Sequence, residues 1–531
     1  MALLDPILPN PASPLVKWGK LYGAAPALAL AEAAAKAAGP LIVIARNSRD
    51  AESLSEEIRF FAGAALTVRV FPDLETLPYD AFSAHPDITS ARLATLAELP
   101  RARHGVWLVA VDTLMQRLAP RSFIEAYSLK VHVGETLDID ALRARLAAAG
   151  YAAVTQVVAH GEFAVRGSLI DVFPMGSDTP FRIDLLDRDV DSIRRFDPDT
   201  QRSLDTLERI QLLPARETPL NPDAVREFRR RYRLRFTGDL SEQSVYRDVS
   251  QGIAPGGIEY FLPLFFDHTS NLFEYIPPDS VLIDMNDSAA LVDGLWSGIV
   301  DRHEQLRHDR HRPILDPAEI YLRPAEFLES YAARSQVQLH TFEWPPGTPG
   351  SYQNFPSAAP NAVRIDPRAE QPAAELATHI ESSVARILLA AESAGRRELL
   401  LDLLRGRDVQ AKIFDSFASF AASSQRLGII VSSAVSGLAL DTPPLEILTE
   451  AQLFGDRARQ ERRRRRAERD PAKILKELSD LHIGSPVVHE SYGVGRYVGL
   501  QTMEVAGHTG EFLVLEYADG DKLYVPVQAL H

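Results

Sequence analysis

The sequence predicts a multidomain α/β protein, and three observations support this fold class. Its 531 residues suggest roughly three to five domains, because a domain usually holds about 100 to 200 residues. Short apolar runs alternate with helical stretches in two separate parts of the chain, which is typical of parallel sheets covered by helices. The carboxyl-terminal part instead contains alternating strands joined by short turns, which is typical of a small all-β module.

Residues 1–125 are expected to form the first α/β domain. Its predicted buried parallel strands are the apolar runs PLIVIA at 40–45, LTVRVFP at 66–72 and GVWLVAV at 105–111. The pattern then changes to strands joined by a turn, which predicts an inserted α+β domain over residues 126–213. Residues 214–345 return to a helical and mixed pattern and are expected to complete the first domain.

A second small α/β domain is predicted over residues 346–455. It follows a Pro/Gly/Ser-rich stretch that starts at Trp344 and is interpreted as a linker or loop. RILLAAESAGRRELLLDLLRG, from Arg386, predicts a strand, a turn and a helix, and LGIIVSSAV predicts a further strand.

Residues 456–477 are predicted to be an Arg-rich linker. A DNA contact is the alternative for this segment, but acidic residues interrupt the run and its Arg side chains would point all round a helix. The chain as a whole has 49 Arg against 8 Lys, which is typical of a GC-rich genome and lowers the weight of any Arg cluster. We therefore favour a solvated linker.

The final module, residues 478–531, is predicted to be a small SH3-like or Tudor-like β-barrel. Strands are expected near Val487 and over 494–505, 511–518 and 522–527, and Asp519-Gly520 is a strong hairpin signal. Seven acidic residues against two basic ones disfavour phosphate binding, so this module is expected to bind protein.

Composition and charge exclude several classes of function. The chain has no cysteine, which excludes disulfides, thiolate metal sites and cysteine nucleophiles. A net charge of −15 disfavours wrapping the whole molecule on nucleic acid. No apolar run of about 18 residues and no export-signal pattern is visible, so we expect a cytoplasmic protein without a membrane partner.

The search for catalytic groups is negative. The turn KLYGAAPALALAEAA, from Lys20, is where an α/β chain would carry phosphate-binding residues, but of the P-loop pattern G-x-x-x-x-G-K-[ST] only Gly23 remains. A catalytically silent α/β layer is favoured over weak nucleotide binding. The His-rich DRHEQLRHDRHRP, from Asp301, is interpreted as a solvated helix face, and the carboxylates of DLLDRDVD at 184–191 as surface ion pairs. We predict no catalytic residue, no metal site and no cofactor.

Several long stretches resemble one known family. They are VVHESYGVGRYVGL and GEFLVLEYADGDKLYVPV near the carboxyl end, HGEFAVRGSLIDVFPMGSDTPFRIDLLD from His160, ETLPYDAFSAHPDITSARLATLAELP from Glu75, DTLMQRL from Asp112 and GGIEYFLPLFF from Gly256. Together they are similar to the bacterial transcription-repair coupling factors along essentially the whole chain. The resemblance implies that the first ~345 residues form a module similar to the helicase UvrB, with a degenerate helicase-like domain that has lost its ATP site.

The resemblance also implies partners. The inserted domain would recruit UvrA, and the final module would bind the β subunit of stalled RNA polymerase. DNA would be bound mainly, and ATP and magnesium only, by motor domains that family members carry downstream, and the sequence stops at His531 before them. Two rivals stay open: a self-sufficient nucleotide-dependent helicase or nuclease, which an ATPase assay would reveal, and a stand-alone transcription regulator that uses only the barrel.

Candidate contact residues follow from strand alternation together with the family positions. In PFRIDLL, Phe181, Ile183 and Leu185 share one face, which is expected to be core. Arg182 and Leu186 share the other face with Arg166 on a neighbouring strand, and these three match the UvrA-contacting positions of the family, where the third is often aromatic. Ordinary surface ion pairs are the alternative.

Met503 is the candidate contact to RNA polymerase. It matches an apolar contact position of the family that is usually Leu, and its unbranched side chain adapts to a partner's groove. The alternative is that Met503 fills the barrel core, since so small a barrel needs nearly every large apolar residue.

Overall fold

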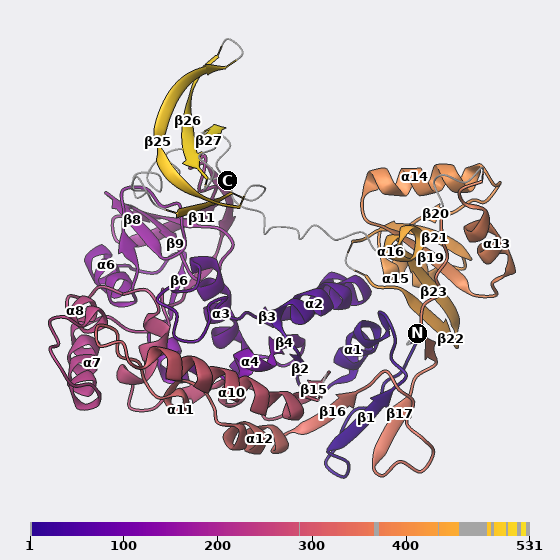
Figure 1. Cartoon of the computed structure of the whole chain (residues 1–531), viewed down its shortest axis with the longest axis horizontal. Helices are drawn as coiled ribbons and strands as arrows, with labels where there is room; N and C mark the ends of the chain where they lie inside the picture. The colour runs from indigo at the N-terminus through magenta and orange to yellow at the C-terminus, as the bar shows by residue number, and fades with distance from the viewer. Residues whose placement is uncertain are drawn as a thin grey trace. The chain divides into compact units, whose positions relative to one another are not determined.

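The computed structural model describes two compact units, residues 1–455 and 456–531. The described residues are 3–285, 287–365, 371–433, 435–455, 486–489, 493–505, 508–517 and 522–526. Figure 1 shows the chain from its amino terminus in indigo to its carboxyl terminus in yellow. Among the described helices, none is long and apolar enough to cross a membrane.

A seven-stranded parallel sheet forms the centre of the first unit. Its order is β17-β1-β16-β15-β2-β4-β3. The strands are β1 (Leu15–Gly19), β2 (Leu41–Ala45), β3 (Val68–Phe71), β4 (Val106–Ala110), β15 (Val281–Asp284), β16 (Ser335–Leu339) and β17 (Ser351–Asn354). The three strands predicted from apolar runs are confirmed as β2, β3 and β4. β17 lies in the stretch interpreted as a linker, so that interpretation is wrong for these residues.

Helices cover both faces of this sheet, and β2 shows why its sequence is apolar throughout. Ile42 and Ile44 pack into one hydrophobic core, whereas Leu41 and Val43 pack into the other. The principal covering helices are α1 (Ala25–Lys36), α2 (Ser48–Ala62), α3 (Pro86–Glu98), α10 (Ser288–Leu306) and α12 (Pro324–Ala332). Shorter helices are α4 (Val111–Leu114), α5 (Arg121–Ala126), α8 (Ser244–Ser250), α9 (Leu272–Tyr275), α11 (Pro317–Ile320) and the 3-10 helix η3 (Ile258–Leu264). The longer helix α7 (Pro222–Arg235) packs against α8 and η3.

The inserted α+β domain is built on a six-stranded sheet of order β12-β11-β10-β9-β8-β7. The chain enters it through β6 (Leu129–His132) and leaves through β13 (Arg209–Leu212), which pair antiparallel with each other. The sheet contains β7 (Ala152–Ala153), β8 (Glu162–Arg166), β9 (Leu169–Phe173), β10 (Phe181–Leu186), β11 (Asp189–Phe196) and β12 (Ser203–Leu207), with α6 (Ile139–Ala148) beside it. The predicted strands of this region are confirmed.

The second α/β domain has a mixed sheet of order β18-β22-β23-β19-β21-β20. The predicted strand, turn and helix are β19 (Arg386–Ala391) and α14 (Ala394–Arg405), and the further predicted strand is β21 (Leu427–Val431). The remaining elements are β18 (Ser357–Ala358), β20 (Lys412–Ile413), β22 (Leu438–Asp441), β23 (Pro444–Thr449), α13 (Ala374–Ser382), α15 (Phe417–Ala422) and α16 (Glu450–Phe454). Leu388 and Ile447 of this domain belong to the same hydrophobic core as α1.

The second unit is a four-stranded antiparallel meander of order β24-β25-β26-β27. Its strands are β24 (Pro486–His489), β25 (Gly493–Val505), β26 (His508–Glu516) and β27 (Lys522–Pro526). All four predicted strands are present, and β26 begins three residues earlier than predicted. Closure into a barrel stays a prediction. Residues 456–477 and the Asp519-Gly520 pair lie outside the described residues.

Candidate functional site

The turn between β1 and α1 occupies the place where α/β proteins commonly bind phosphate, at the carboxyl end of a central parallel strand. In this protein, residues of the second α/β domain form hydrogen bonds with that turn. The N–H of Ala24 donates to the carbonyl oxygen of Gly437 at 2.9 Å, and the N–H of Tyr22 donates to Ser357 Oγ at 3.2 Å. Gly23 has a φ of 54°, and a methyl group on it would overlap the same Gly437 oxygen. The N–H of Ala24, at the start of α1, therefore already has a partner within the chain.

Asp284, at the carboxyl end of β15, is a buried acid that sequence reasoning did not single out. Its carboxylate accepts hydrogen bonds from Tyr331 Oη and from Ser288 Oγ, both at 2.8 Å. Burial, followed by the nearby Asp284 charge, raises the pKa of the Tyr331 phenol well above its ordinary value. These contacts tie α10 and α12 to the sheet, which is a structural role. The available signal was an acid directly after the apolar run VLI.

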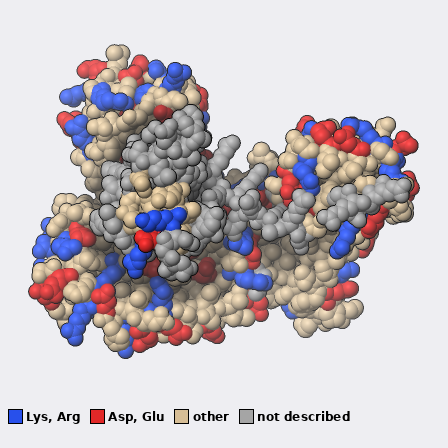
Figure 2. Space-filling model, turned by 45° about the horizontal axis from the view of Figure 1, so that its top comes forward, with Lys and Arg blue, Asp and Glu red and all other residues tan. Residues whose placement is uncertain are grey.

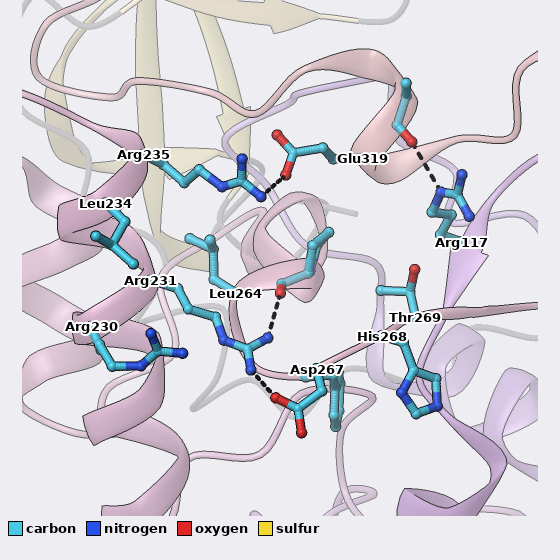
Figure 3. A pocket seen from close by; sticks show the side chains of 13 residues that line it. Arg117, Arg230, Arg231, Leu234, Arg235, Leu264, Asp267, His268, Thr269 and Glu319 are labelled. Atoms are coloured by element: carbon cyan, nitrogen blue, oxygen red, sulfur yellow. Dashed lines mark hydrogen bonds and ion pairs between the residues drawn. The ribbon is translucent and has the colours of Figure 1, made fainter.

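A pocket of about 570 Å³ lies between α7, β5 (Arg117–Leu118), α11 and the loop after η3 (Figure 3). Four arginines line it, and all of them donate to carboxylates or backbone carbonyls. Arg117 donates to Ala318 O at 3.0 Å, Arg235 pairs with Glu319 at 2.9 Å, and Arg231 pairs with Asp267 and Glu227. Hydrogen bonds from Arg230 and then Arg231 lower the pKa of Glu227 to about 2.

This pocket does not present a recognisable catalytic set. Its arginines already pair with acids or backbone carbonyls, and His268 also lines the pocket. In the described part of the chain, no group of three or more His, Asp or Glu side chains could hold a metal ion. On the face shown in Figure 2, basic and acidic side chains are interspersed, with no single basic surface.

One prediction about the His-rich segment is wrong. Helix α10 ends at Leu306, so only His303 of that cluster lies in the helix. Its side chain is 14% exposed and packs on the ring of Tyr79, with ring centroids 5.5 Å apart. A helix face that looked solvated in sequence is therefore partly covered by the loop after β3.

The outer face of the inserted domain holds the residues predicted to contact UvrA. The alternation in β10 is as expected, because Phe181, Ile183 and Leu185 are buried in the core. On the opposite face, Leu186 is 73% exposed, and it lies toward the same end of the sheet as Arg166.

A buried carboxylate brings the two arginines of this face together. Asp171 on β9 is fully buried and lies between β8, which carries Arg166, and β10, which carries Arg182. Arg182 donates from Nε to Asp171 Oδ1 at 2.8 Å and from Nη2 to Oδ2 at 3.0 Å, and Arg166 Nη2 donates to the same Oδ2. The side chain of Arg166 is 50% exposed and that of Arg182 is 17% exposed.

Apolar side chains pack against this polar cluster. The guanidinium of Arg182 lies 4.8 Å from the ring centre of Phe196, which packs with Phe173 and Ala164 in a small separate core. The remaining guanidinium nitrogen of Arg182, Nη1, donates a hydrogen bond to the carbonyl oxygen of Gln201 at 3.2 Å. The hydrogen bond that Arg182 donates to Asp171 raises the pKa of Arg182 above its ordinary value. Arg182 is thus charged and fixed in place.

Met503 lies on β25, where its backbone is opposite Gly510 of β26. The side chain of Met503 lies outside the described residues, so its assignment as a contact or a core residue stays a prediction.

Three family models match separate parts of the chain. The model described as UvrB interaction domain matches residues 129–217, which contain the sheet with Arg166, Arg182 and Leu186. The model described as MFD, D3 domain matches residues 379–453 of the second α/β domain. The model described as CarD-like/TRCF RID domain matches residues 481–531.

Curated relatives match over nearly the whole chain. A transcription-repair-coupling factor of Haemophilus influenzae is 37% identical over 544 residues, covering 100% of this chain and 46% of the relative. The Escherichia coli protein of the same name is 39% identical over 514 residues, covering 97% and 44%. The Myxococcus xanthus one is 30% identical over 543 residues, covering 96% and 44%.

The chain belongs to the transcription-repair-coupling factor family. It spans less than half the length of the curated relatives that it matches. The matches connect it with DNA repair coupled to transcription, and the family resemblance seen in the sequence is confirmed.

Proposed function

We propose that this chain is a cytoplasmic adaptor of transcription-coupled repair, which binds UvrA through the inserted domain and the β subunit of RNA polymerase through its last module. One observation carries the proposal. Within the region that matches the UvrB interaction domain, Arg166 is half exposed and Leu186 is 73% exposed on the outer face of the same sheet. Arginine and exposed apolar side chains are typical of the few residues that dominate binding energy at protein interfaces.

The partner of the last module is proposed from its match and its charge. Residues 481–531 match the CarD-like/TRCF RID domain, and the module carries more acidic than basic residues. Acidic surfaces repel the phosphate backbone, so a protein partner is favoured over nucleic acid. Met503 is the proposed contact on β25.

The chain by itself is proposed to have no enzymatic activity and no cofactor. The closed turn at Ala24 supports this, because a carbonyl oxygen of Gly437 takes the hydrogen bond that a phosphate oxygen would need. ATP hydrolysis, DNA translocation and displacement of stalled polymerase are proposed only for the full-length proteins of the family. ATP turnover by this chain that exceeds a buffer blank would favour the helicase or nuclease rival.

A capture experiment tests the UvrA assignment. The chain is immobilised and purified UvrA is passed over it, with the double variant Arg166→Ala, Arg182→Ala in parallel. The matched control is Arg143→Ala, because Arg143 lies on α6 of the same domain, is 52% exposed and pairs with the exposed Asp140. The parent and the control should retain UvrA, and the double variant should lose it. Equal capture by all three proteins would refute the assignment.

A further inference from the structure

Asp171 differs from the other carboxylates of the inserted domain, because it is buried and forms ion pairs with two arginines at once. Its side chain has no exposed surface, yet it forms ion pairs with Arg166 and Arg182 from the strands on either side. A buried charge that is not paired is strongly unfavourable, so the carboxylate and both guanidiniums form one unit. A change at Asp171 therefore removes an ion pair from each arginine.

The two arginines are held to different degrees. Arg182 is fixed by Asp171, by the ring of Phe196 and by the carbonyl of Gln201, and little of it is exposed. Arg166 is half exposed, and among the described residues its ion pair is with Asp171. The carboxylate is thus the group that selects one conformation for the more exposed arginine.

We propose that Asp171 is the positioning residue of this binding face: it does not touch the partner, but it holds Arg166 in the conformation that the partner contacts, whereas Arg182 is also held by Phe196 and Gln201. This inference rests on the UvrA-binding role proposed above. A long arginine side chain that is free to rotate loses conformational entropy when it binds, and one that is already held in place loses less. The bidentate pairing with Arg182 adds geometric specificity that a single hydrogen bond would lack.

A double-mutant cycle separates positioning from a general loss of stability. Asp171→Asn keeps the size of the side chain and removes its charge, and it is combined with Arg166→Ala. If Asp171 acts through Arg166, its replacement should weaken UvrA binding when Arg166 is present and have little further effect when Arg166 is absent. A defect of the whole fold would weaken binding in both backgrounds.

The measurement is the dissociation constant of the complete chain with purified UvrA, determined by titration calorimetry. We expect Asp171→Asn to raise it by about tenfold or more in the parent background and by less than about twofold in the Arg166→Ala background. The matched control is Asp205→Asn on β12, where the carboxylate pairs with Arg195 at 2.6 Å and both side chains are about half exposed. This control should stay within about twofold of the parent.

Two outcomes would overturn the inference: parent-like affinity of Asp171→Asn, or an equal loss in both backgrounds. If Asp171→Asn does not fold, Asp171→Glu replaces it. This variant keeps the negative charge but moves the carboxylate by the length of one methylene group, which shifts both guanidiniums. Parent-like affinity of Asp171→Glu would also overturn the inference. A failure of the proposed UvrA-binding function would give a different result from a failure of this inference. In that case the parent chain does not bind UvrA, or binding does not depend on Arg166.

Discussion

The N–H of Ala24 donates to the carbonyl oxygen of Gly437 at 2.9 Å, so a residue at the start of the first helix is capped by the second α/β domain. Ser357 of the same domain contacts both Tyr22 and Lys20 in this turn. The turn that resembles a phosphate-binding loop in position therefore joins two domains of this chain. Gly23 leaves room for the carbonyl oxygen of Gly437, and the energetic value of that contact can be tested.

Replacing Gly23 with Ala should destabilise the first unit by about 2 kcal/mol or more. The new methyl group would overlap the Gly437 carbonyl, and a φ of 54° is unfavourable for alanine. Gly252→Ala is the control, because Gly252 also has a positive φ but a methyl group on it would enter open space. Urea denaturation of both variants measures the difference. Equal losses would mean that the contact with Gly437 has no energetic consequence.

The buried pair of Arg92 and Glu217 should contribute strongly to stability. The Arg92 side chain is 2% exposed, pairs with Glu217 at 2.7 Å and donates to Pro72 O at 2.9 Å. Glu217→Gln leaves a buried guanidinium without its counter-charge, so we expect a loss of about 3 kcal/mol or more.

The exposed pair of Arg69 and Glu98 provides the comparison for that measurement. Both side chains are about half exposed, so Glu98→Gln should cost less than about 1 kcal/mol. Chemical denaturation monitored by tryptophan fluorescence gives both values. A loss for Glu217→Gln no larger than that for Glu98→Gln contradicts the prediction.

Glu227 should make the stability of the first unit depend on pH in a defined direction. Hydrogen bonds from Arg230 and then Arg231 lower its pKa from 4.5 to about 2. A carboxyl whose pKa is lower in the folded state stabilises that state above the unfolded pKa, and this stabilisation is lost as the pH falls from about 4.5 toward 2. Solvent reaches this group, so the effect should stay below about 1 kcal/mol.

The comparison of parent and Glu227→Gln tests this direction. Their unfolding free energies should differ most near neutral pH and converge as the pH approaches 2. Glu242→Gln, at an exposed position that follows α7, is the control and should follow the parent at every pH. A gap between Glu227→Gln and the parent that grows toward low pH would show the opposite sign and refute the assignment.

Met503→Arg distinguishes the two roles proposed for Met503. If the side chain contacts the polymerase, the variant should keep the circular dichroism of a folded module and lose binding to the β subunit. If it fills the core, the module should unfold, because a buried arginine without a partner is strongly unfavourable. A folded variant that binds β like the parent would remove Met503 from the contact surface.

Local patterns were sufficient to predict many strands but not the contacts between distant segments. The apolar runs of β2 and β4 are buried on both faces, so they are visible as runs in the sequence. β1 was not predicted, because LVKWG contains a lysine and a glycine and resembles a loop. Its strand conformation depends on pairing with β16 and β17, more than three hundred residues away in sequence.

The same limit applies to the binding face. Alternation within β10 correctly separated core residues from Arg182 and Leu186, because it is a property of a single strand. Asp171 was not identified, because its role depends on the register that places it beside Arg182 and between two strands. The closure of the turn by Gly437 likewise depends on how two domains pack. Such contacts have no local sequence signal.

The adaptor account is tested most directly by asking whether one chain holds both partners at once. UvrA is immobilised, and the retention of purified RNA polymerase is measured with and without the chain. The account predicts that polymerase is retained only when the chain is present, and that either the Arg166→Ala, Arg182→Ala pair or Met503→Arg abolishes retention. Retention that is unchanged by both sets of substitutions, or no retention with the parent chain although it is folded, would contradict the account.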